Sequence, residues 1–197
     1  MKKNKRNSLK SNHFKMFLPV LSIIGIGIIF IISLFYEKSW TYNWSEIRQQ
    51  IKDSVRIAEH DGISSGVVGY DARKPAQFDR RHWIMKNATT SELLKLTEYP
   101  NGTIKTIAYE GLIRKREYKN KNALILKAIA DTEYPIHYQS GCVGSSMNIG
   151  EYLVDVVLQI GDNSPPPPKG FGLKFGLSEK ECLAIVTKYR KTPSLWR

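Results

Sequence analysis

The chain opens with one long apolar run and continues with stretches in which apolar residues recur at helical spacing. From residue 16 to residue 36 no side chain is charged, and isoleucine, leucine, phenylalanine and glycine dominate. A helix rises about 1.5 Å per residue, so a helix over this run can cross a hydrocarbon core of about 30 Å. We therefore predict a transmembrane helix over 16–36, after a basic tail at 1–15.

The alternative to this membrane anchor is a cleaved secretory signal. Such signals have an apolar region of about 7–15 residues and end at a site flanked by small residues. Here the run is longer and ends in Leu34, Phe35 and Tyr36, which favours an uncleaved anchor. Basic residues cluster before the run, so we expect the N-terminus inside and residues 37–197 outside. Lysine, isoleucine and asparagine are frequent, as in a low-GC bacterium, and the predicted location is therefore a bacterial inner membrane.

The clearest amphipathic pattern lies between residues 87 and 116. Thr89 and Glu92 have the spacing of a capping box, and the turn-forming residues at 99–102 end the helix that they begin. A second helix follows at once, and its apolar stripe is formed by Ile104, Ile107, Ala108, Gly111 and Leu112. Lys105 and Glu110 lie off this stripe and are expected on the polar face.

Similar patterns predict four more regions of helix and one closing helix. Apolar residues at helical spacing mark 45–58, 75–86, 122–131 and 148–160. A capping box of Ser178 and Glu181 begins the last helix, whose buried face is expected to include Leu183, Ile185, Val186 and Tyr189. The segment 65–70 is the one most open to forming a short strand instead.

Two of these helices end in the same four residues. Thr97-Glu98-Tyr99-Pro100 and Thr132-Glu133-Tyr134-Pro135 are 35 residues apart, which is in the range of stacked helical repeats. After the second copy, a segment at 136–147 stands where the first copy has a tight turn. Over about 75–160 the chain resembles HEAT-type helical repeats. The resemblance implies an all-α domain of antiparallel helix pairs with an extended surface for a protein partner.

These observations divide the chain into six parts. We expect a cytoplasmic tail at 1–15, the transmembrane helix at 16–36 and a juxtamembrane helix with a Gly-rich loop at 37–74. HEAT-like helix pairs at 75–160, a Pro-rich linker at 161–177 and the closing helix at 178–197 follow. The fold class is all-α, with one N-terminal transmembrane helix.

The segment 136–147 carries the only candidate for nucleophilic chemistry. It contains His137, Ser140 and Cys142, and a histidine close to a cysteine could make the thiol a thiolate. Cys142 could instead form a disulfide with Cys182, since an outward-facing domain permits it, or Cys182 could be buried and unpaired. None of the four histidines has zinc-ligand spacing, so no metal and no cofactor are predicted.

Basic residues are densest between 114 and 127. The net charge of the 197 residues is +12, and six of the 30 basic residues lie in the tail. The run at 114–127 could be a solvated helix end, or it could face an anionic partner. With His137 and Ser140, the candidate binding residues here are Arg114, Lys115, Lys119, Lys121 and Lys127. An acidic protein or a lipid surface fits them, whereas nucleic acid does not, because the run carries almost no interleaved aromatic residue.

Two hypotheses of function follow. In the first, the chain is a membrane-tethered, non-catalytic scaffold that binds a protein partner, because repeats form binding surfaces and no acid/base constellation is evident. In the second, it is a hydrolase or transferase that uses the segment around Cys142, since function often gathers in loops.

Overall fold

The computed structural model describes the backbone of residues 10–34, 41–161 and 174–194, and the side chains of 19–33 within the first range. Most of the predicted linker (162–173) and the first part of the predicted tail (1–9) therefore lie outside the described residues. The contacts of the chain divide it into two units, Met1–Lys38 and Ser39–Arg197.

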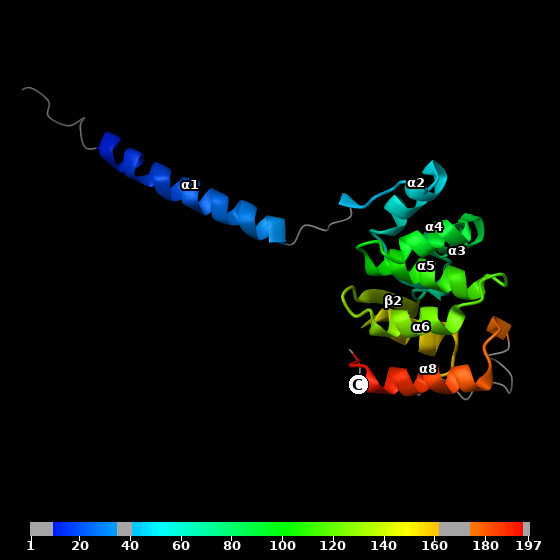
Figure 1. Ribbon diagram of the computed structural model, residues 1–197. Coiled ribbons are helices and arrows are strands. Elements are labelled where there is room, and N and C mark those ends of the chain that lie inside the picture. Colours follow the sequence, from blue (N-terminus) through cyan, green and yellow to red (C-terminus); the bar gives the residue numbers. More distant parts are fainter. Residues whose placement is uncertain (1–9, 35–40, 162–173, 195–197) are drawn as a thin grey trace, which may run out of the picture. The chain divides into compact units, whose positions relative to one another are not determined.

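Helix α1 (Lys10–Leu34) covers most of the predicted transmembrane run (Figure 1). In the described part of the chain, no helix is both long enough and apolar enough to cross a membrane. This finding contradicts the predicted transmembrane helix at 16–36 and, with it, the single-pass location in a bacterial inner membrane.

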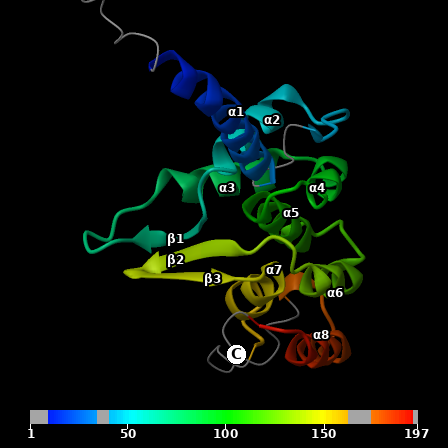
Figure 2. The ribbon, with the colours of Figure 1, turned by 90° about the vertical axis from the view of Figure 1, so that its left-hand side faces the viewer.

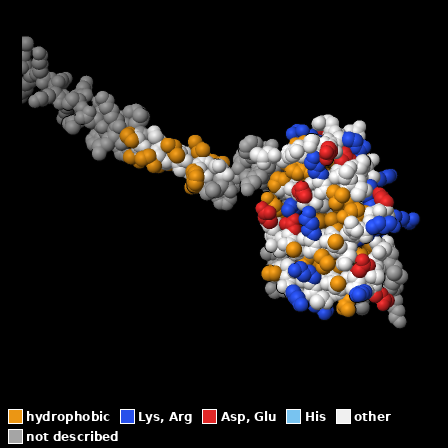
Figure 3. All heavy atoms as spheres, in the orientation of Figure 1, with side chains coloured by type: hydrophobic (Ala, Val, Ile, Leu, Met, Phe, Trp, Pro, Cys, Tyr) orange, Lys and Arg blue, Asp and Glu red, His pale blue; other side chains and the backbone are white. Residues whose placement is uncertain are grey.

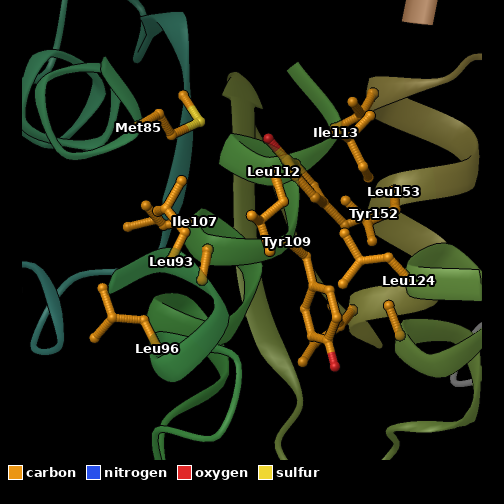
Figure 4. Packing of buried hydrophobic residues seen from close by; sticks show 14 of the residues in the cluster. Met85, Leu93, Leu96, Ile107, Tyr109, Leu112, Ile113, Leu124, Tyr152 and Leu153 are labelled. Atoms are coloured by element: carbon orange, nitrogen blue, oxygen red, sulfur yellow. The ribbon is translucent and has the colours of Figure 1, made fainter. Parts of the chain in front are cut away.

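Helix α5 (Gly102–Arg114) is the centre of the second unit and is buried on every side. All of its residues from Gly102 to Ile113 are buried. Figure 4 shows Ile107 on the side of Met85 and Leu93, and Ile113 on the side of Leu153. The predicted single apolar stripe is therefore too narrow, because neighbours pack against both faces of α5.

The other helices of this unit lie on both sides of α5. In Figure 1, α2 to α4 lie on one side of α5, and α6 and α8 lie on the other. The bounds are α2 Gln49–Ala58, α3 Ala76–Asn87, α4 Thr90–Leu96, α6 Lys121–Ala130, α7 Ile149–Glu151, the π-helical segment η2 Tyr152–Val157 and α8 Glu179–Lys191.

Side-chain caps begin α4 and α8 as the sequence predicts. The Thr89 hydroxyl accepts from the Glu92 N–H at 3.2 Å, and Glu92 Oε2 accepts from the Thr89 N–H at 2.8 Å. Ser178 and Glu181 form the same reciprocal pair before α8. Such caps are readable from sequence because both partners lie within one helical turn.

A three-stranded mixed sheet projects from the helices (Figure 2). Strand β1 (Ile63–Val68) is parallel to β2 (Ile136–Gly141), which is antiparallel to β3 (Val143–Met147). Gly141 begins the two-residue turn between β2 and β3 with a φ of 55°, a left-handed conformation that glycine adopts without steric cost.

The sheet makes the fold mixed α/β, so the predicted all-α class is wrong. Residues 136–147, expected as a loop between paired helices, form the β2–β3 hairpin, and 63–68 forms the third strand. The HEAT-like interpretation of 75–160 is wrong for the same reason. The backbone of β2 pairs with β1, which places Tyr138 beside Ile63, and local periodicity cannot reveal a partner so far away in the chain.

A buried charged network joins α3, α5 and η2. The Tyr152 hydroxyl accepts from Arg81 Nη1 at 2.6 Å and donates to Glu110 Oε2 at 2.9 Å. The other oxygen of Glu110 accepts from Arg114 at 2.7 Å. Burial, together with the Glu110 carboxylate, raises the pKa of Tyr152 well above its usual value. The hydroxyl therefore stays protonated and donates its hydrogen bond to Glu110.

A second ion pair attaches the segment that precedes α2 to helix α4. Arg48 donates to both carboxylate oxygens of Glu92, from Nε at 2.9 Å and from Nη2 at 2.8 Å. The backbone N–H of Arg48 donates to Glu92 as well. These hydrogen bonds, led by that of the Arg48 side chain, lower the pKa of Glu92 to about 2.

Replacing Glu110 should be among the most damaging substitutions in the chain. Glu110→Ala leaves the Arg81 charge buried without its carboxylate, which typically costs about 3–5 kcal/mol of unfolding free energy. Urea denaturation of the full chain, followed by circular dichroism, measures the loss. The exposed Glu117→Ala is the matched control, and equal losses in the two variants would contradict the role given to the network.

Glu92 should make stability depend on pH below 4.5. Its pKa is lowered in the folded state, so its contribution is present above the unfolded value of 4.5 and disappears as the pH falls toward 2. Glu92→Gln is expected to cost about 1–3 kcal/mol at pH 7, and the difference from wild type should shrink in acid. Denaturation curves at a series of pH values test this, with the exposed Glu133→Gln as control. A difference independent of pH would contradict the assignment.

Candidate functional site

The end of the sheet farthest from the helices exposes apolar side chains. We define the sheet end as residues 67–70 and 140–143, where β1 stops and β2 turns into β3. Tyr70 is fully exposed, Val143 is 70% exposed and Val67 is 51% exposed. A hydrogen bond of 2.9 Å from the Gly69 N–H to the Gly141 carbonyl ties the two segments together. The sheet end is thus a backbone-braced surface with no charged side chain.

A pocket of about 300 Å³ lies nearer the helices, between β1, β2 and the start of α3. Asp61, Ser64 and His137 line it, the three residue types of a nucleophile triad. These three side chains do not form the hydrogen-bonded chain of such a triad in the described structure. The Ser64 hydroxyl is buried and has no hydrogen-bond partner among the described residues, and Asp61 accepts from Arg80 at 3.4 Å. This arrangement does not support nucleophilic catalysis in the pocket.

The predicted pair of His137 and Cys142 is also separated. His137 lies opposite Ser146 in the hairpin, whereas Cys142 occupies the exposed turn. The extended strand takes the chain about 10 Å from His137 to Ser140, and Cys142 lies beyond it in the turn, outside hydrogen-bond reach. The imidazole of His137 instead lies close to Gly144, where an added Cβ would be 3.1 Å from Cε1. His137 is therefore not placed to act as a base for Cys142.

Both cysteines are free thiols in the structure. Cys142 is on the hairpin turn and Cys182 is partly buried on α8. Burial, followed by Glu181 and Glu179, raises the pKa of the Cys182 thiol. Cys182 is therefore the less reactive of the two.

The predicted basic residues do not form one open surface. Lys121 is 7% exposed, and its ammonium donates to the Phe175 carbonyl at 2.8 Å. Arg114 is held by Glu110, and Lys115 lies 3.8 Å from Glu117. Lys119 and Lys127 are exposed, on the connection before α6 and on α6 itself. Ser140 is exposed at the sheet end.

In the part of the chain that the structure describes, no group of three or more His, Cys, Asp or Glu side chains is placed to hold a metal ion. Comparison with protein-family models, with curated proteins and with solved structures finds no match. A function can therefore be inferred only from the chemistry of the surfaces of the chain.

Two exposed apolar surfaces had no signal in the sequence. Tyr70 and Val143 gave no signal, because a lone apolar residue in a Gly-rich segment has no period. Leu183 was expected in the buried face of the last helix, yet it is 68% exposed. Its neighbours on α8 include lysines that were not among the predicted binding residues.

The two thiols should react at different rates, and His137 should not affect the rate at Cys142. A maleimide should label Cys142 faster than Cys182, because Cys142 is exposed and burial raises the pKa of Cys182. Single-thiol variants made with Cys142→Ser and Cys182→Ser allow each rate to be measured against pH. His137→Ala should leave the Cys142 rate within about twofold. A large slowing would restore the thiol–imidazole hypothesis.

Proposed function

We propose that the protein is a non-catalytic binding protein that contacts a protein partner through the sheet end. The main support for this proposal is the full exposure of Tyr70, together with the exposed Val67 and Val143, on a projecting sheet. Aromatic side chains are enriched at protein–protein interfaces, and exposed apolar groups that cluster mark interaction sites.

The geometry favours binding over catalysis for a second reason. The sheet end is braced by the β1–β2 pairing and by the Gly69–Gly141 hydrogen bond, so its side chains are presented with little loss of conformational entropy. In the pocket, in contrast, the Ser64 hydroxyl has no hydrogen-bond partner among the described residues, and Cys142 on the hairpin turn is not next to His137. A partner surface with an apolar hollow for Tyr70 is the complement that fits.

Photocrosslinking in cells that naturally make the chain tests the proposal. A photoreactive phenylalanine analogue replaces Tyr70, Val143 or, as a control, the exposed Lys86 at the end of α3. We expect one adduct of the same mass from positions 70 and 143, at least tenfold above that from position 86. Added wild-type chain should compete it away, whereas a Tyr70→Ser/Val143→Ser chain should not.

Three results would contradict the proposal. They are the absence of an adduct, equal adducts from all three positions, and competition by the double variant that equals that of wild type. Cys142→Ser separates the hypotheses further. A binding protein should keep its adduct, while loss of the adduct on this change alone would favour chemistry at the thiol.

A further inference from the structure

A groove on the surface of the second unit lies between α6 and α8. It has a volume of about 520 Å³, and Leu126 of α6 and Leu183 of α8 line it. The remaining lining residues are all on α8, namely Lys180, Ala184, Thr187, Lys188 and Lys191. Figure 3 shows hydrophobic and basic side chains next to one another on the face that carries α6 and α8. The groove is independent of the sheet end.

The lining residues of α8 form one stripe along that helix. Their spacing places them on a single face over nearly the full length of α8. From Lys180 to Lys191 the helix rises about 16 Å, or three turns. Leu183 lies within this stripe and is 68% exposed, although the same helix buries Ile185 and Tyr189. Leu183 and Ala184 are thus open apolar positions in this stripe, beside the covered face of α8.

The charge of the groove is of one sign. Three lysines and no acid line it, and none of the three forms an ion pair among the described residues. Favourable interaction with the helix dipole explains Lys188 and Lys191, which lie in the last turn of α8. It does not explain Lys180, since a cation in the first turn is unfavourable there. The lysines are therefore distributed along the groove-lining face of α8 and not gathered at one helix end.

We propose that this groove binds an acidic amphipathic helix of a protein partner. Such a helix has apolar side chains to contact Leu126 and Leu183, and acidic residues beside them to pair with the lysines. A single fatty acid has one carboxylate and would satisfy the lysines at one end only. Positive charge at both ends of a three-turn groove favours the peptide.

The probe is a synthetic peptide of about 18 residues with leucine at i, i+3, i+4 and i+7 and glutamate beside them, a length that permits a helix. Fluorescence anisotropy with the full chain should show saturable binding that weakens as salt rises. A scrambled peptide of the same composition and a peptide with lysine in place of glutamate should bind at least tenfold more weakly.

Matched variants locate the binding. Leu183→Asp should weaken it at least tenfold, whereas Leu94→Asp, on an exposed leucine of α4, should change it less than twofold. Lys188→Glu with Lys191→Glu should weaken it and reduce its salt dependence. Lys86→Glu at the end of α3 should not. Circular dichroism of each variant checks that the helices are intact.

The proposal fails if the peptide does not saturate, if the scrambled peptide binds equally, or if the control variants lose as much binding as the groove variants. Dodecanoate is the probe for the other anionic occupant. If it binds with the same sensitivity to Leu183→Asp while the peptide does not bind, the groove takes a fatty acid and the proposed peptide is wrong.

Discussion

The complete burial of α5 is the constraint on which the rest of the second unit depends. A helix that carries Lys105 and Glu110 can be buried on all sides only if both charges find partners. Lys105 Nζ lies 2.7 Å from Asp131, and Glu110 is held by Arg81, Arg114 and Tyr152. These contacts draw α3, η2 and the end of α6 against α5, so the polar network fixes which helices surround it.

The arrangement around α5 also sets the position of the sheet. Gly102, at the start of α5, lies so close to the Tyr134 and Pro135 carbonyls that an added Cβ would be 2.6 Å and 2.8 Å from them. This close approach brings the chain entering β2 against the core. Ile136 is buried there, while Val143 at the far end is exposed. One end of the sheet is therefore anchored and the other is free to meet a partner.

The two proposed surfaces use different chemistry. The sheet end is uncharged and presents an aromatic side chain, whereas the groove of α6 and α8 is apolar and basic. A partner with an acidic helix fits the groove and gains nothing at the sheet end. Binding at each surface can therefore be tested, and removed by substitution, without affecting the other.

The sequence alone determined the local features of this protein. The capping boxes before α4 and α8 and the helices of 90–96, 102–114 and 121–130 involve residues within a few turns of each other, so spacing revealed them. The tertiary structure decided what depends on distant partners. It paired Ile63 with Tyr138 to make a sheet where loops were predicted. It also buried Lys105, Glu110 and Lys121 by giving each a polar partner that is distant in the sequence. It also left Leu183 exposed, because burial of a helix face depends on which neighbour packs there and not on the pattern of the helix itself.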